Sequence, residues 1–108
     1  MKTFVEFRKY ESIESLSSVN RDYTIPSGKQ LILREIGGNG FGAGTSVSIV
    51  WDPDGDHEII LVTEGDCMQS SSKAMTGDGS RVVRITLSNQ TLATKDLGAY
   101  FIGWELDG

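Results

Sequence analysis

The chain has little of what disulfide-bonded and zinc-binding proteins require. Cys67 is its single cysteine among 108 residues, so no disulfide can form within it. Small secreted domains usually carry several disulfides. His57 is the single histidine, and with Cys67 it leaves a tetrahedral zinc site at least two good ligands short. We therefore expect no zinc centre and no disulfide framework, which fits synthesis in a reducing cytoplasm.

Clusters of basic residues and long apolar runs are also lacking. The net charge is −5, and residues 51–108 alone sum to −6. Nucleic-acid phosphates require clustered Lys and Arg to displace counterions, and no such cluster is present. No apolar stretch approaches the roughly 20 residues of a transmembrane helix, and residues 1–8 lack the apolar run of a signal peptide. We expect neither a nucleic-acid partner nor a membrane partner.

Catalytic and cofactor motifs are absent or fail on their context. No Gly-x-Ser-x-Gly elbow surrounds a serine nucleophile. Residues 38–43 match the Gly-x-Gly-x-x-Ala form of a dinucleotide loop, but that motif needs a helix N-terminus directly after it. Residues 45–50 instead alternate as a strand does. The sequence therefore predicts no enzyme and no cofactor.

Alternation of apolar and polar residues is the dominant pattern in the chain, and it indicates β-strands. The cleanest runs are residues 81–87, 45–51 and 3–10. Turn signals separate such runs about every ten residues in the second half, as in sandwiches and barrels. We predict an all-β protein, a jelly-roll-like β-sandwich of about eight strands. One globular domain is expected, with an N-terminal strand or arm over residues 1–20 and the sandwich over residues 21–108.

Two segments of the chain qualify this picture. Residues 59–62 are apolar at every position, which predicts a strand covered on both faces. Residues 11–19 space three apolar side chains three apart but are rich in serine, so a short helical turn and an extended connector both remain open.

An acidic stretch between two predicted strands is the first candidate site. Asp52, Asp54, Asp56 and Glu58 follow one another at every second position, and hard cations such as calcium bind several converging oxygens. The Gly and Glu of an EF-hand loop are missing at the required positions. The favoured interpretation is a solvated hairpin turn, in which Asp52 bonds its own backbone and Gly55 takes a positive φ. A calcium loop is the alternative, and we assign no metal.

Aromatic residues supply the candidate contacts with partners. Phe41 lies on a glycine-rich loop, where an aromatic can serve a protein interface. Phe4 and Phe7 lie on the N-terminal segment, which could reach a neighbouring subunit. Trp51 and Trp104 lie at strand ends, where core packing is the default and stacking on a sugar is the alternative.

The segment Tyr23-Thr24-Ile25-Pro26-Ser27-Gly28-Lys29 precedes an apolar strand. It resembles a pattern in small β-sandwich proteins of tailed-phage particles, and the similar layout extends over residues 21–106. Proline at the second position and glycine at the fourth suggest a type I turn over residues 25–28. The resemblance implies a jelly-roll-like fold, a structural role in the virion and no catalytic residues.

The resemblance implies a capsid decoration protein or a head or tail surface protein. Such a protein is made in the host cytoplasm and resides in the virion, where its partners are other capsid, neck or tail proteins. We expect a homo-oligomer, because virion sites are arranged by symmetry. The alternative function is a carbohydrate- or calcium-binding module that uses the Asp52–Glu58 loop and either Trp51 or Phe41.

Overall fold

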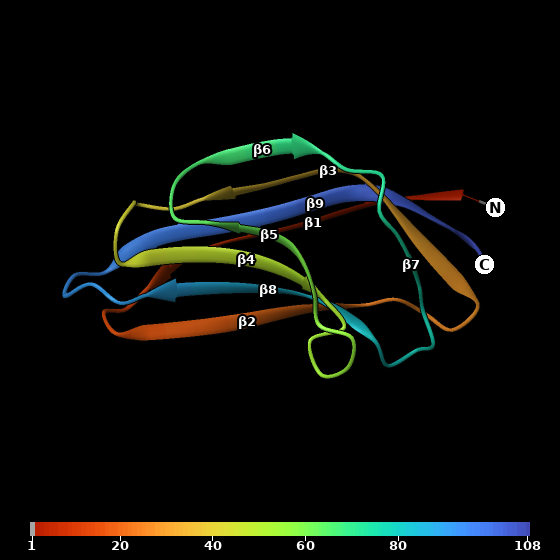
Figure 1. Cartoon of the computed structure of the whole chain (residues 1–108), viewed down its shortest axis with the longest axis horizontal. Coiled ribbons are helices and arrows are strands. Elements are labelled where there is room, and N and C mark those ends of the chain that lie inside the picture. Colours follow the sequence, from red (N-terminus) through yellow and green to blue (C-terminus); the bar gives the residue numbers. More distant parts are fainter. Residues whose placement is uncertain (1) are drawn as a thin grey trace.

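The computed structural model describes residues 2–108, and within that range it contains strands and loops but no helix (Figure 1). No membrane-spanning helix is therefore found among these residues. The strands are β1 (Lys2–Ile13), β2 (Ser17–Thr24), β3 (Lys29–Asn39), β4 (Thr45–Trp51), β5 (Glu58–Thr63), β6 (Cys67–Ser70), β7 (Ala74–Thr76), β8 (Val82–Asn89) and β9 (Lys95–Asp107).

The strands form two antiparallel sheets that pack face to face as a sandwich. The five-stranded sheet has the order β1-β9-β3-β6, with β7 also paired to β3. The four-stranded sheet has the order β2-β8-β4-β5. The first strand thus pairs with the last and the second with the one before it, as in a jelly roll. The predicted fold class is confirmed.

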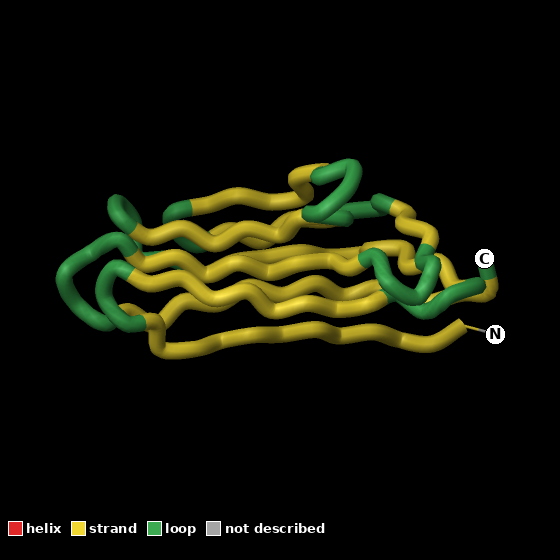
Figure 2. Tube along the Cα trace, turned by 90° about the horizontal axis from the view of Figure 1, so that it is seen from below, coloured by secondary structure: helices red, strands yellow, loops and turns green. Residues whose placement is uncertain are grey.

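The strands run along the long axis of the molecule, and most loops gather at its two ends (Figure 2). Both termini lie at one end, while the β3–β4 and β8–β9 loops lie at the other (Figure 1). The molecule measures 46 × 25 × 19 Å, and its smaller dimensions are those of two stacked sheets. The distal loops are thereby brought together from distant parts of the sequence.

The core lies between the sheets and follows the predicted alternation. Val83, Ile85 and Leu87 of β8 are fully buried, while Arg84 and Thr86 face outward. The same alternation buries Val47 and Ile49 of β4 and Val5 of β1. Burial of these side chains stabilises the fold by roughly 1.5–3 kcal/mol each.

Two short strands share one position at the edge of the five-stranded sheet. β6 pairs with residues 35–38 of β3, and β7 pairs with residues 30–32. A β-bulge in β3 between Leu33 and Glu35 separates the two pairings, because the extra residue disrupts the ladder and bends the strand. The bulge lets both Leu33 and Ile36 reach the core. The sandwich therefore has eight strand positions and nine strands.

The N-terminal segment belongs to both sheets. β1 pairs with β9 over its whole length, from Lys2 opposite Leu106 to Ile13 opposite Lys95. β2 pairs with β8. Between them Leu16 takes a positive φ of 57°, so residues 11–19 turn sharply between two strands and form no helical turn. The segment predicted as a strand or arm thus contributes β1 and the first half of β2.

Two local predictions are wrong. Residues 59–62 are not covered on both faces, because Ile59 and Val62 of β5 are 63% and 58% exposed while Leu61 is buried. The turn before β3 is displaced by one residue, since the Lys29 N–H donates to the Pro26 carbonyl. Gly28 therefore occupies its third position, with a φ of 80° that favours glycine.

Candidate functional site

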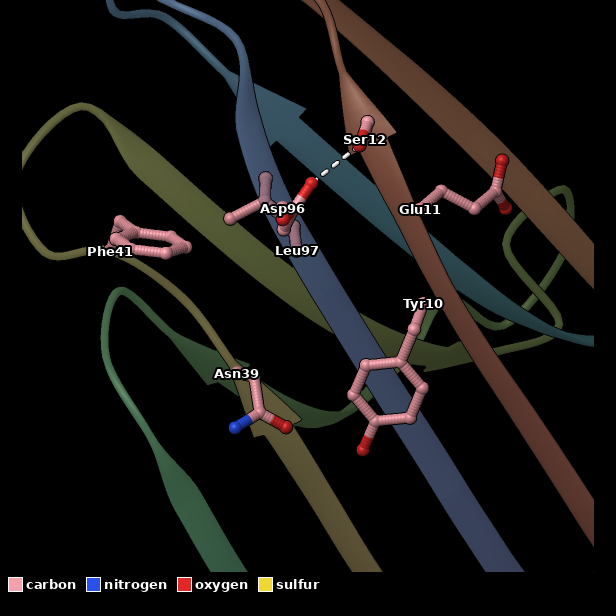
Figure 3. A pocket seen from close by; sticks show the side chains of 7 residues that line it. All are labelled: Tyr10, Glu11, Ser12, Asn39, Phe41, Asp96 and Leu97. Carbon is pink, nitrogen blue, oxygen red and sulfur yellow. Dashed lines mark hydrogen bonds between the residues drawn. The ribbon is translucent and has the colours of Figure 1, made fainter.

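A hollow lies at the end of the five-stranded sheet. It has a volume of about 470 Å³ and lies at the end of the molecule opposite the termini. Its lining comes from β1, β9 and the end of β3 with the loop beyond it (Figure 3). The lining residues are Tyr10, Glu11, Ser12, Asn39, Phe41, Asp96 and Leu97.

A glycine in the middle of the sheet explains the position of Tyr10. Gly98 of β9 lies between Tyr10 and Asn39 in the register of the three strands. A Cβ atom at Gly98 would come within 2.0 Å of Tyr10 Cδ1, so the Tyr10 ring can lie across β9 only because Gly98 has no side chain. The ring is 52% exposed. It forms one side of the hollow (Figure 3).

The loop after β3 holds Phe41 on the opposite side of the hollow. The Phe41 N–H donates to Thr45 Oγ1 at 2.9 Å, and the Gly42 N–H donates to the Glu64 carbonyl at 2.6 Å. Lys95 lies 5.4 Å from the centre of the Phe41 ring, a distance at which a cation attracts an aromatic face. Backbone hydrogen bonds thus fix a glycine-rich loop while its aromatic ring stays 60% exposed.

Polar groups lie between the two aromatic rings. Ser12 Oγ donates to Asp96 Oδ1, and Asn39 Nδ2 donates to Asp66 Oδ1 at 3.2 Å. Asp96 keeps its second carboxylate oxygen as an acceptor, and Asn39 keeps its amide oxygen. Glu11 points away from the hollow (Figure 3) and accepts two hydrogen bonds of 2.7 Å from Arg21. The hollow therefore offers two aromatic faces with carboxylate and amide acceptors between them.

A buried asparagine anchors the strands behind the hollow, and sequence patterns gave no sign of its role. Asn89 is fully buried at the end of β8. Its amide nitrogen donates to the carbonyls of Ile13 and Ala93, each at 2.8 Å. Its oxygen accepts from the Thr91 N–H at 2.9 Å and from Thr91 Oγ1 at 2.7 Å. One side chain thus joins the end of β1 in one sheet to the end of β8 in the other.

The acidic stretch forms the loop of the β4–β5 hairpin, and Arg81, which precedes β8, pairs with two of its four carboxylates. Arg81 Nη2 donates to Asp52 Oδ2 at 2.9 Å and to Asp56 Oδ2 at 2.8 Å. The Asp56 N–H and Arg81 both bond Asp52, and they hold the pKa of Asp52 below its usual value. The positive φ falls at Asp52 and His57 and not at Gly55, where it was predicted.

The other two acidic candidates do not join Asp52 and Asp56. Glu58 accepts a hydrogen bond from Lys73 Nζ. Asp54 lies exposed at the tip of the loop. Within residues 2–108 no three His, Cys, Asp or Glu side chains are grouped to hold an ion.

The four predicted contact residues divide into exposed and packed pairs. Phe4 and Phe41 are half-exposed or more, so both can meet a partner. Phe7 packs on the core, with its ring 5.2 Å from that of Phe101. Trp51 is only 4% exposed and lies under Arg81, whose guanidinium is 4.6 Å from its ring. Trp51 therefore cannot serve as a sugar-stacking platform.

The outer face of the five-stranded sheet carries apolar and aromatic side chains. Trp104 lies on this face, where the Phe4 ring meets it edge-on at 5.2 Å, so core packing holds for Trp51 and not for Trp104. Tyr100 donates to Glu35 Oε2 at 2.6 Å. Burial and this hydrogen bond raise the pKa of Tyr100 to about 12. The sequence did not indicate an apolar outer face here, because residues 99–106 place apolar side chains on both faces of the strand.

Sequence comparison finds no matching protein-family model. No curated protein matches the chain either. Among solved structures, the Yersinia pseudotuberculosis-derived mitogen matches with a TM-score of 0.55 at 10% identity, over 95% of this chain and 86% of that one. This likeness concerns the fold.

Two further structures match more loosely. The core of Drosophila NLP, described for pentamer formation and histone binding, has a TM-score of 0.45 at 10% identity over 92% of this chain and 97% of that one. A chain of the infectious bursal disease virus Gx strain has a TM-score of 0.36 at 10% identity. That match covers this whole chain but only 32% of the viral one.

Proposed function

We propose that the protein is a structural accessory protein of a virus particle, of the tailed-phage type, that acts by docking and self-assembly. The observation that carries the proposal is the open edge of the five-stranded sheet. β1 is 12 residues long and pairs with β9 alone. The other edge of β1 therefore has no neighbouring strand within residues 2–108.

An open edge of this length is a natural assembly surface. Its backbone N–H and C=O groups can pair with a strand of another chain, and soluble proteins usually protect such edges by keeping them short. Beside the edge, Phe4 is half-exposed and packs on Trp104, so the adjacent sheet face adds apolar contact area. The resemblance of residues 23–29 to phage sandwich proteins supports the placement in a particle.

The test of assembly is the absolute mass in solution, measured by light scattering at several concentrations. We expect a defined multiple of the 11.8 kDa chain. A monomer at the highest concentrations would refute self-assembly. The placement in a particle has its own test, because purified virions of the source should contain the chain in many copies per particle. Its absence from such virions would refute that part.

Carbohydrate binding is the second candidate, and the hollow favours it. Sugars present flat C–H faces that stack on aromatic rings, and hydroxyls that carboxylate and amide groups bind. Tyr10 and Phe41 supply exposed rings, while Asp96 and Asn39 supply acceptors. A hollow of about 470 Å³ falls within the usual size of small-molecule sites.

A glycan panel screened by surface binding tests this second function. If it is correct, Phe41→Ala should weaken binding at least tenfold, whereas the matched control Leu92→Ala should leave it unchanged. Leu92 is an exposed apolar residue outside the lining of the hollow. We expect calcium to leave the melting temperature unchanged, because Arg81 already occupies Asp52 and Asp56. The absence of any bound glycan would refute this function.

A further inference from the structure

The open edge of β1 is self-complementary, and this property selects both a partner and a register. The even-numbered residues Phe4, Glu6, Arg8 and Tyr10 are exposed on the outer face of the sheet. Val5 is buried and Phe7 packs on the core, so the odd-numbered residues face inward. Residues directly opposite each other in an antiparallel pair share a face. Two copies can therefore continue each other's sheets only if even positions oppose even positions.

This condition places one residue of β1 on a two-fold axis, and like charges eliminate several of the possible positions. An axis at Glu6 sets two carboxylates against each other, and an axis at Arg8 or Lys9 does the same with two cations. An axis at Val5 sets Lys2 against Arg8. Like charges directly opposite destabilise a strand pair. The axis at Phe7 avoids every such clash and pairs residues 2–12, nearly the whole of β1. Axes at Phe4 and Tyr10 also avoid like charges, but they pair only residues 2–6 and 7–13 of the strand.

With the axis at Phe7, unlike charges meet on both sides of it. Glu6 of each copy lies opposite Arg8 of the other, so two ion pairs form. Phe4 of each copy lies opposite Tyr10 of the other, so no charged residue is unpaired at that position. Opposite charges are a cross-strand combination that stabilises sheets. Within one chain, Glu6 and Arg8 make only an exposed contact of 3.4 Å.

We infer that a second copy of this chain pairs antiparallel with β1, with Phe7 on the two-fold axis. This inference rests on the proposed self-assembly and specifies its partner and register. The interface is isologous, because the same strand serves both copies. The Tyr10 ring leans across β9 and away from the edge (Figure 3). The hollow therefore stays open in the dimer.

Reversing the two charges tests the register. Glu6→Arg places two cations opposite each other at both pairs, and Arg8→Glu places two carboxylates there. We expect each single variant to raise the dimer dissociation constant at least tenfold, measured by sedimentation equilibrium. The double variant Glu6→Arg/Arg8→Glu exchanges the charges and should dimerise like the wild type. An equimolar mixture of the two single variants should form a heterodimer, because unlike charges then meet at every position.

Controls separate the register from folding and from net charge. Asp54→Arg makes the same charge change as Glu6→Arg at the exposed tip of the β4–β5 hairpin, and it should leave the dimer intact. Arg8 lies 4.4 Å from the Tyr100 ring, so the melting temperature of each Arg8 variant is measured alongside. Recovery in the mixture rules out a folding defect, because both single variants are then competent to pair.

The outcomes distinguish the two proposals. A monomeric wild type refutes self-assembly, and the register with it. An oligomeric wild type whose mass neither single variant changes keeps self-assembly and refutes the β1 register. Loss in the single variants without recovery in either the double variant or the mixture also refutes the register.

Discussion

Replacing Asn89 with alanine removes a side chain that four hydrogen bonds tie to three residues, and we predict a large loss of stability. The Ile13 carbonyl and the Thr91 N–H lose their bonds of 2.8 and 2.9 Å to a fully buried side chain. An orphaned polar group costs about 1–3 kcal/mol where it is buried, as at Ile13, and less where it is half-buried, as at Thr91. Ala93 is exposed and water can replace its bond. Two such groups predict that Asn89→Ala lowers the free energy of unfolding by about 3 kcal/mol.

Urea denaturation followed by circular dichroism measures this loss. For a domain of this size, about 3 kcal/mol corresponds to a fall in melting temperature of roughly 12 °C or more. Asn20→Ala is the matched control, since Asn20 is exposed and accepts one hydrogen bond from Thr86. It should change stability by less than about 0.5 kcal/mol. A loss below about 1 kcal/mol for Asn89→Ala would refute the view that this amide joins the two sheets.

Two further predictions concern residues of β9. The pKa of Tyr100 is raised to about 12 in the folded protein, so its proton stabilises the fold fully below pH 10, and that contribution is lost as pH rises to 12. Between pH 10 and pH 12, the free energy of unfolding from urea titrations should therefore fall less for Tyr100→Phe than for the wild type. An equal fall with pH in both proteins would contradict this. Gly103→Ala should destabilise strongly, because its Cβ would lie 2.2 Å from the Ile32 carbonyl oxygen. Gly98→Ala should cost less, since the exposed Tyr10 ring can move; equal melting temperatures would show that the backbone contact does not matter.

Strands and turns were predictable because their signals are local. Residues 81–87 and 45–51 alternate with period two, and the structure confirms both strands and their buried faces. Turn residues at 52–55 marked the β4–β5 hairpin for the same reason. The turn before β3 was placed one residue too early, because Pro26 and Gly28 fit more than one turn type.

The candidate site was predictable only in part. Phe41 stood out as an aromatic on a glycine-rich loop, and it does line the hollow. Nothing in the sequence linked it to Tyr10, which is 31 positions earlier and reaches it only through the pairing of β1, β9 and β3. Arg81 likewise lies 29 positions from Asp52. The sequence therefore gave no sign that a basic side chain pairs with the acidic stretch.

The sequence by itself determined that this chain forms a sandwich of antiparallel strands. Alternation needs only neighbouring residues, and one apolar face per strand requires a second sheet to cover it. The tertiary structure alone decided which face of β9 turns inward, because both of its faces are apolar. Phe101 enters the core while Trp104 remains on the outer face. Long-range strand pairing also decided that β1 ends the sheet, and thus that its edge is open to a second chain.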